Sequence, residues 1–240
     1  MKRSVWIIAF AFVLLADVTL NELGYDSFRL ITKPLLLPLL FLHFYFLTSY
    51  TVSSLKNCYT LALAFCWVGD ALLLFERYDP IFFILGLSAF LLGHISFIIC
   101  FNKLRLEKDL LFKPKTILPV VLYYITLVSL LYNHLGSLLL PVLVYGVAIC
   151  AMLVMAMNLI RLKNKRAAAL IFSGVLAFVL SDSILAINKF YQSFRFAGTI
   201  VMLTYGIAQA CICMGMVEIL NKTVKKTKKR PSWRQQQSLN

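Results

Sequence analysis

The chain has few acidic residues, few histidines and no CxxC pair of cysteines. Only 10 of its 240 residues are Asp or Glu, and only 3 are His. None of the six cysteines belongs to a CxxC pair, which argues against a disulfide framework. Charged residues of all kinds make up 14% of the chain, whereas a soluble domain has about one quarter. This shortage excludes an ordinary soluble enzyme.

Hydrophobic residues take the place of the missing charges and make up 61% of the chain. A membrane-spanning helix needs roughly 20 apolar residues. By that measure the sequence predicts eight spans, near residues 4–21, 34–52, 57–76, 80–101, 117–132, 137–160, 166–188 and 197–220. The N-terminal run lacks a clear signal-peptide cleavage site and is interpreted as a retained first helix.

The expected fold class is therefore all-α: a polytopic membrane protein with eight transmembrane helices. Residues 1–221 are expected to form the transmembrane domain, and residues 222–240 a basic, disordered tail. No alternating strand pattern and no soluble domain is found in the sequence.

Positive charge is distributed unevenly between the two expected sides of the membrane. The net charge of +14 would suggest nucleic acid in a soluble protein. With the N-terminus inside, however, nineteen of the 24 Lys and Arg fall in the inner segments and five in the outer ones. Because positive residues gather on the cytoplasmic side, the pattern predicts both termini in the cytoplasm. The expected partner is a lipid bilayer and not a nucleic acid.

Four acidic residues lie within the expected spans: Asp17, Asp70, Asp182 and Glu218. A charged side chain at mid-bilayer costs about 2.5–3.5 kcal/mol, so such residues commonly face a protein interior or a cavity. Asp17 and Glu218 are close to span ends and are expected to reach water. Asp70 and Asp182 lie deeper and need another explanation.

Asp70 and Asp182 are expected at the same depth in the membrane. Asp70 lies six residues before Glu76 on the third span, roughly 9 Å below its outer end at 1.5 Å per residue. Asp182 lies seven residues before Lys189 on the seventh span, roughly 10 Å below the same side. Two carboxyl groups on different helices at one level predict a shared polar pocket.

The seventh span also has small residues at every fourth position, which allow a neighbouring helix to approach closely. They form a ridge just before Asp182, at Ala169, Ser173, Ala177 and Ser181. Other polar residues reach the predicted pocket if helices two, three, seven and eight surround it: Lys33, Asn188, Lys189, Thr204, Tyr205 and Gln209.

Each of these residues also has a purely structural interpretation. Thr204 and Gln209 can hydrogen-bond neighbouring helices, and Lys33 and Lys189 can extend to the lipid headgroups. Tyr205 can belong to an aromatic belt at the membrane surface. The two aspartates can be neutral and form interhelical hydrogen bonds.

Five segments together resemble the lysoplasmalogenase (YhhN) family of multispan membrane proteins. They cover nearly the whole chain except the tail, and they are "KPLLLPLL" at 33–40, "VGDALLLF" at 68–75, "GHISFI" at 93–98, "SDSILAINKF" at 181–190 and "TYGIAQ" at 204–209. The resemblance implies hydrolysis of the vinyl ether bond of lysoplasmalogens to a fatty aldehyde and glycerophosphoethanolamine or glycerophosphocholine. It implies that Asp70 and Asp182 are the catalytic acids. Its lysine-proline and NKF positions fall on Lys33, Asn188 and Lys189.

Two carboxyl groups suit this chemistry independently of the resemblance. Protonation of the β-carbon of a vinyl ether creates an oxocarbenium ion, to which water adds, and the hemiacetal then collapses. A protonated carboxyl supplies the proton, and a carboxylate stabilises the cation and activates water. Neighbouring carboxyls tend to share one proton. No metal or organic cofactor is expected, and a bacterial inner membrane is the expected location.

Two other functions are compatible with buried acids. One is a proton- or cation-coupled transporter, although no inverted repeat is found. The other is a zinc-dependent lipid hydrolase, which needs several histidines near acidic residues. The chain has only His43, His94 and His134, and they are far apart in the sequence, so a three-histidine site is not expected.

Overall fold

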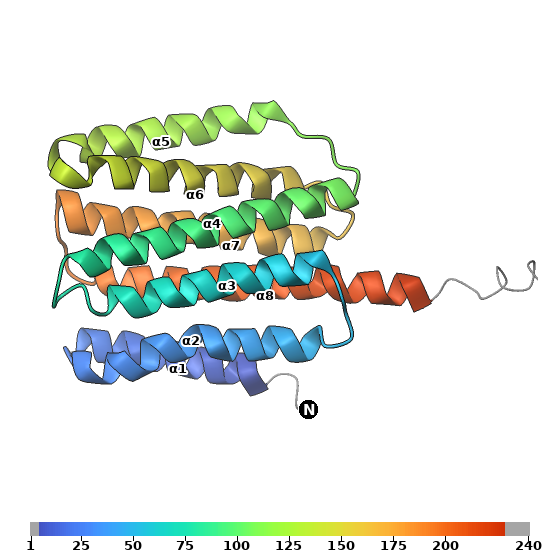
Figure 1. Ribbon diagram of the computed structural model, residues 1–240, viewed down its shortest axis with the longest axis horizontal. Helices are drawn as coiled ribbons and strands as arrows, with labels where there is room; N and C mark the ends of the chain where they lie inside the picture. Colours follow the sequence, from blue (N-terminus) through green and yellow to red (C-terminus); the bar gives the residue numbers. More distant parts are fainter. Residues whose placement is uncertain (1–4, 229–240) are drawn as a thin grey trace, which may run out of the picture.

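The structure, a computed structural model, describes residues 5–228, with side chains described up to residue 221. This part of the chain is a bundle of long, roughly parallel and antiparallel helices (Figure 1). The eight α-helices are α1 (Val5–Glu22), α2 (Asp26–Leu47), α3 (Ser54–Leu73), α4 (Ile81–Glu107), α5 (Ile117–Leu131), α6 (Leu139–Leu159), α7 (Lys165–Ala186) and α8 (Ala197–Lys228). The all-α fold and the eight predicted helices are confirmed for the described residues.

Seven of these helices are long and apolar enough to cross a membrane: α1, α2, α4, α5, α6, α7 and α8. The eighth, α3, is less apolar because it begins with Ser54, Lys56 and Asn57 and carries Asp70 near its end. It nevertheless packs along α4 and against α2. Helix α3 is therefore an integral member of the helix bundle.

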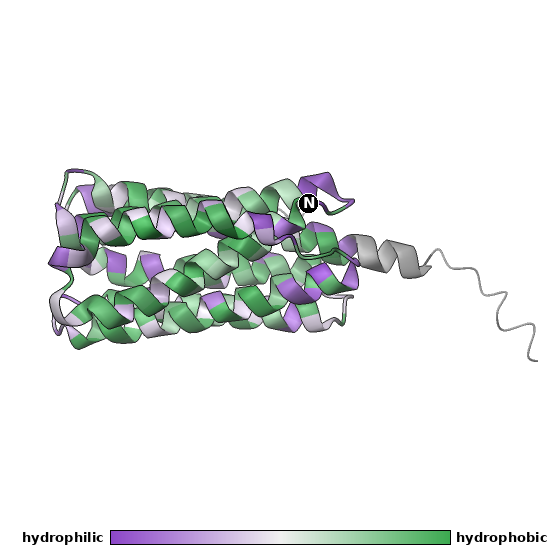
Figure 2. Ribbon diagram, turned by 90° about the horizontal axis from the view of Figure 1, so that it is seen from above, coloured by the Kyte–Doolittle hydropathy of each residue, from purple (hydrophilic) through white to green (hydrophobic). Residues whose placement is uncertain are grey.

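The start of α1 and the end of α8 lie at the same end of the bundle (Figure 1). We call this the terminal end. The opposite end, which we call the distal end, has the four connections at residues 23–25, 74–80, 132–138 and 187–196. Hydrophilic residues gather at both ends, and the stretch between them is mainly apolar (Figure 2). This distribution is what a bilayer requires of a spanning bundle.

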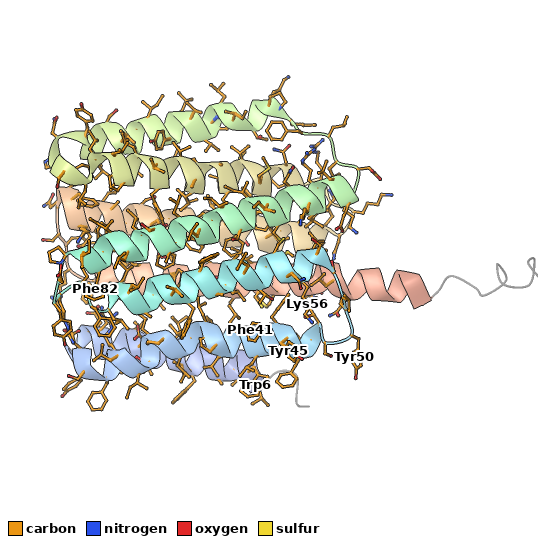
Figure 3. The ribbon with its side chains drawn as sticks, in the orientation of Figure 1. Trp6, Phe41, Tyr45, Tyr50, Lys56 and Phe82 are labelled. Atoms are coloured by element: carbon orange, nitrogen blue, oxygen red, sulfur yellow. The ribbon has the colours of Figure 1, made fainter. Side chains whose placement is uncertain are left out.

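Aromatic side chains and a lysine gather toward the terminal end (Figure 3). The ring of Trp6 stacks on Phe46 at 5.8 Å between centroids. Lys56 lies 5.0 Å from the centre of the Tyr45 ring and donates to the carbonyl oxygen of Thr48 at 2.9 Å. Aromatic and basic side chains of this kind are typical of the membrane–water interface.

Helix α2 begins at Asp26, eight residues before the predicted start, and continues through Pro34 and Pro38. The prediction that Pro34 opens the helix was therefore wrong, and Lys33 lies inside the second turn. Pro38 has no N–H to donate to the carbonyl oxygen of Pro34. The indole Nε1 of Trp67, on α3, donates to that oxygen instead at 2.8 Å. This bond gives the carbonyl oxygen of Pro34 a donor and connects α2 to α3.

Three other predicted boundaries also changed. Helix α4 continues to Glu107, because the segment after residue 101 keeps contacts with the bundle through Leu104. Helix α7 ends in a π-helical turn, Ile187–Tyr191. Helix α8 runs on to Lys228, and residues 229–240 of the predicted tail lie outside the described part. Because the tail was not tested as a whole, its assignment stays a prediction.

Helices α7 and α8 pack very closely, and of the predicted ridge Ser181 takes part, because its Oγ donates to the carbonyl oxygen of Val201 on α8 at 2.9 Å. Ala169 and Ser173 are exposed on the outer surface. The contact lies one position further along, where a Cβ on Gly174 would be 2.8 Å from the carbonyl oxygen of Ala208. Ser181 of the ridge thus contacts α8, whereas the step of about 100° per residue around the helix leaves Ala169 on the outer surface.

The core near the terminal end consists of stacked aromatic rings from α2, α3 and α4. The centroid distances are 4.5 Å between Phe44 and Tyr59, 6.0 Å between Tyr59 and Phe97, and 5.8 Å between Phe97 and Phe101. All four side chains are completely buried. This part of the bundle is filled by side chains.

Candidate active site

Toward the distal end the bundle contains a cavity of about 140 Å³, which we call the main cavity. Most of its lining is apolar and comes from α4, α5, α6 and α7. The polar residues in the lining are few, and several are titratable: Lys33, Asp70, Tyr123, Tyr124, Tyr145, Ser181, Asp182, Ser183, Lys189 and Tyr205. Both aspartates predicted to share a pocket line this cavity.

Asp70 is almost completely buried, with 2% of its surface exposed. The hydroxyl of Tyr205, on α8, donates to Asp70 Oδ2 at 2.7 Å. Lys33 Nζ lies 4.0 Å from the other carboxylate oxygen of Asp70, Oδ1. The carboxyl group of Asp70 is thus held between an O–H donor and an ammonium group.

Gly69 explains how Tyr205 reaches Asp70. A Cβ at Gly69 would be 2.5 Å from the ring of Phe90, so only glycine lets α4 bring Phe90 this close to α3. Phe90 in turn packs edge-to-face on the ring of Tyr205, 6.0 Å between centroids. The glycine next to Asp70 therefore allows the ring packing that supports the hydroxyl donor.

Asp182 has a different environment from Asp70. The hydroxyl of Tyr145, on α6, donates to Asp182 Oδ2. No Lys, Arg or His nitrogen among the described side chains lies within 4.0 Å of this carboxyl. The side chain is only partly buried, and it borders the cavity. Ser183, the next residue, hydrogen-bonds the hydroxyl of Tyr123 on α5.

Lys189 closes the distal side of the main cavity. It lies in the π-helical turn at the end of α7, a feature that often marks functional sites. Its ammonium group pairs with Glu76 and lies 4.2 Å from the centre of the Phe83 ring. The side chain thus connects α7 to the end of α3 and the start of α4.

The structure brings together five of the eight predicted site residues: Lys33, Asp70, Asp182, Lys189 and Tyr205. Lys33 does not extend to the lipid headgroups, because only 12% of its side chain is exposed and it faces Asp70. Gln209 is completely buried, and its Nε2 lies 3.4 Å from the Tyr205 hydroxyl. It therefore supports Tyr205 without lining the cavity.

Asn188 and Thr204 do not line the main cavity. The side-chain oxygen of Asn188 accepts a hydrogen bond from the backbone N–H of Phe194 at 3.2 Å. The hydroxyl of Thr204 donates to the carbonyl oxygen of Ile200, one turn earlier in α8, at 2.6 Å. Both side chains serve the local backbone, and we remove them from the candidate site.

The contributions of α5 and α6 to the cavity were not predicted from the sequence. Tyr123 and Tyr145 border the cavity and bond Ser183 and Asp182, but nothing in the sequence separates them from the other tyrosines. Their hydroxyls can be assigned only once the packing of α5 and α6 on α7 is known. The predicted set of four surrounding helices was therefore incomplete.

Asp17 is completely buried and does not reach water, so that expectation was wrong. It faces α2, where Thr32 Oγ1 donates to Asp17 Oδ1 at 2.7 Å and Arg29 Nε lies 3.6 Å from the same oxygen. The early start of α2 provides both partners. Glu218 is partly exposed, as expected, and pairs with Arg166 at 3.8 Å.

The described residues contain no group of three or more His, Cys, Asp or Glu side chains arranged to hold a metal ion. His94 is completely buried, and its ring packs edge-to-face on Tyr145 and Phe178 at centroid distances of 5.1 and 5.0 Å. The chemistry that this arrangement supports is proton transfer by the two carboxyl groups in an apolar cavity.

Comparison with known proteins identifies the family of the chain. The model of the YhhN family matches residues 28–216, which include every polar residue of the main cavity. A human protein named Lysoplasmalogenase TMEM86B is 32% identical over 154 residues, which are 64% of this chain and 60% of that relative. The chain thus spans about 60% of the length of the human protein. No solved structure matches. Since the family model covers most of the sequence, the chain belongs to the YhhN family.

Proposed function

We propose that the protein hydrolyses the vinyl ether bond of lysoplasmalogens within the membrane. The observation that carries this proposal is the pair Asp70 and Asp182, which border one apolar cavity from two different helices. The name of the human relative, a lysoplasmalogenase, supports the same reaction. The products are a fatty aldehyde and glycerophosphoethanolamine or glycerophosphocholine.

Asp182 is the proton donor in this proposal. Its carboxyl group has one hydrogen-bond donor and no cation close by, so the protonated form is the favoured one in an apolar cavity. It transfers its proton to the β-carbon of the vinyl ether, and the double-bond electrons form the new C–H bond. Positive charge then develops on the α-carbon and the ether oxygen.

Asp70 is the carboxylate that stabilises this cation and activates water. The Tyr205 hydroxyl and the Lys33 ammonium group both favour its ionised form. Asp70 accepts a proton from the water that adds to the α-carbon. As the hemiacetal collapses, its hydroxyl proton passes to Asp182 and the leaving glycerol oxygen takes the proton from Asp70, so an aldehyde and an alcohol form and both carboxyl groups return to their starting states. The overall reaction consumes one water and needs no external oxidant or reductant.

The alkenyl chain of the substrate lies in the apolar part of the main cavity, between α5, α6 and α7. This part is lined by Leu127, Val128, Leu131 and Val142. The segment Pro114–His134, which contains α5, is the least enclosed of the seven long apolar segments. A lipid can therefore approach the cavity from the bilayer along this helix.

The uneven distribution of Lys and Arg supports a terminal end in the cytoplasm and a distal end on the opposite side. The eight helices of the bundle fit this orientation, because an even number returns the chain to its starting side. The main cavity would then open near the non-cytoplasmic face. A bacterial inner membrane is the proposed location.

The direct test is to incubate the purified full chain in detergent micelles with 1-alkenyl-lysophosphatidylethanolamine and to measure the aldehyde released. The matching 1-acyl lipid serves as the substrate control. Asp70→Asn and Asp182→Asn should each lower turnover by at least about 100-fold, since acid–base groups contribute typically 10²–10⁴-fold. The unfolding temperature should stay close to that of the wild type.

Asp109→Asn is the matched control variant, because Asp109 lies at the terminal end, away from the cavity, and has a positive φ of 50° that asparagine tolerates. It should hydrolyse the substrate at the wild-type rate. If Asp70→Asn or Asp182→Asn did the same, the paired-carboxyl mechanism would be wrong.

A further inference from the structure

A second pocket adjoins the main cavity at the distal end and is more polar. We call it the distal pocket; its volume is about 310 Å³. It shares Lys33 and Leu73 with the main cavity. Its lining comes from the first turns of α2 and the end of α3, namely Asp26, Arg29, Leu30, Lys33, Leu73, Leu74, Glu76 and Arg77. The two pockets thus meet at Lys33.

The cations of the distal end are concentrated around these two pockets. In the proposed orientation this end has five Lys and Arg, at Arg29, Lys33, Arg77, Lys189 and Arg195. All except Arg195 line one of the two pockets. Non-cytoplasmic segments are normally poor in Lys and Arg. Four cations grouped at one place on that side therefore indicate an anionic ligand.

The distal pocket also has carboxylates, which pair with these cations. Arg77 Nη1 lies 3.0 Å from Asp26 Oδ2, and Arg29 Nη1 lies 3.8 Å from Asp26 Oδ1. Arg29 Nε also lies 3.6 Å from Oδ1 of the fully buried Asp17. Glu76 pairs with Lys189. The lining thus offers positive and negative groups side by side.

We propose that the distal pocket binds the zwitterionic phosphoethanolamine headgroup of the substrate. Arg29, Lys33 and Arg77 bind the phosphate, since guanidinium and ammonium groups are the usual partners of phosphate oxygens. Glu76 and Asp26 bind the ammonium group. A headgroup with one charge of each sign matches a lining that contains both.

The position of Lys33 connects this pocket to the chemistry. In a lysoplasmalogen the vinyl ether and the phosphate are attached to the two ends of one glycerol, so their binding sites must adjoin. Lys33 lies within 4.0 Å of Asp70 and lines both pockets. A phosphate bound in the distal pocket therefore places the vinyl ether beside the acid pair. This inference rests on the proposed function for the identity of the lipid.

The test compares two vinyl ethers on the full chain in detergent micelles: 1-alkenyl-lysophosphatidylethanolamine and 1-alkenylglycerol, which has no headgroup. The measured quantity is the ratio of their kcat/KM values. Arg77→Gln should lower this ratio by tenfold or more, mainly through KM for the phospholipid. Arg77 is suited to the test because its side chain is 40% exposed, and its replacement leaves the buried core intact.

Arg195→Gln is the matched control, because Arg195 is the one distal cation in the described structure that lines neither pocket. It should keep the wild-type ratio. Glu76→Gln should reduce the preference for the ethanolamine lipid over 1-alkenylglycerol 3-phosphate, which lacks the ammonium group. An unchanged ratio in Arg77→Gln, or an equal loss in Arg195→Gln, would overturn the headgroup assignment.

A binding measurement separates this proposal from the proposed function. Glycerophosphoethanolamine should bind the wild-type chain in calorimetric titrations, and Arg77→Gln should weaken that binding by about tenfold or more. Inorganic phosphate should bind more weakly, since it cannot use the carboxylates. Binding of glycerophosphoethanolamine without release of aldehyde would contradict the proposed hydrolase activity but support the headgroup pocket. Absence of binding, or equal binding of phosphate, would contradict the pocket even if aldehyde is released.

Discussion

The terminal half of the bundle is closely packed, whereas the distal half contains two adjoining pockets. Phe44, Tyr59 and Phe97 fill the terminal half with rings that are completely buried. In the distal half the same three helices, α2, α3 and α4, surround charged groups such as Lys33 and Asp70. One set of helices thus provides a filled core at one end and a hollow, polar site at the other.

The difference lies in how each half satisfies its polar groups. In the distal half, carboxylates are paired with donors from other helices, as in the contact of Tyr205 with Asp70 and of Arg29 with Asp17. In the terminal half, the interior between α2, α3 and α4 is instead filled by packed aromatic rings. We therefore expect substitutions in the terminal half to change stability and substitutions in the distal half to change activity.

The largest effect on stability is expected for Phe97→Ala. Truncating a buried phenylalanine costs about 3–5 kcal/mol in soluble proteins, and we expect the low end here, about 3 kcal/mol, because the unfolded reference state of a membrane helix is still in lipid. The measurement is thermal unfolding in detergent. Turnover below the unfolding temperature should remain within about threefold of the wild type. A change confined to packing should not slow the reaction by a full factor of ten.

Ile99→Ala is the control for this change, because Ile99 lies on the same helix with 46% of its surface exposed. Ile99→Ala should lower the stability far less than Phe97→Ala does. A loss of activity in Phe97→Ala without a loss of stability would contradict the division between the two halves.

A smaller effect, on activity alone, is expected for Tyr205→Phe. The substitution removes the hydroxyl that donates to Asp70 at 2.7 Å but keeps the ring contacts with Phe90 and Phe178. Loss of a hydrogen bond to a charged group costs about 1.5–3 kcal/mol, so kcat should fall by about tenfold or more. The unfolding temperature should change little. Tyr50→Phe, in an exposed position at 86%, is the control and should have wild-type kcat.

The sequence was sufficient to predict that Asp70 and Asp182 border one cavity. A helix rises a fixed 1.5 Å per residue, so the distance of each aspartate from the end of its span gave its depth. Tyr205 was placed at a comparable depth by the same argument, whereas Lys33 was placed at the outer end of the second span. The depth of a residue depends only on its position within its own helix. For this reason it can be predicted from a single sequence.

The direction in which a side chain points around its helix, and the helix that it faces, could not be predicted in this way. In the α7 ridge, Ser181 contacts α8, but Ser173 was chosen where the close approach lies at Gly174, because direction around a helix changes by about 100° at each position. Asp17 was expected to reach water because the start of α2, which supplies Arg29 and Thr32, was placed too late at Pro34. Both errors concern which helix lies opposite, and that depends on the packing of the whole bundle.

The smallest effect is expected where the two halves meet, at the contact of Trp67 with α2. Trp67→Phe removes the donor to the carbonyl oxygen of Pro34, which Pro38 has left without its helical partner. The loss should be about 1 kcal/mol, as for a typical net hydrogen bond, and it should appear in thermal unfolding. Because Pro34 follows Lys33 directly, the same change should also loosen the position of the ammonium group beside Asp70 and lower kcat by a few-fold. Trp6→Phe, which keeps an aromatic ring for stacking on Phe46, should leave kcat unchanged. If Trp67→Phe lowered stability but not kcat, Lys33 would be positioned by its own helix, and the attachment of α2 to α3 would serve the fold alone.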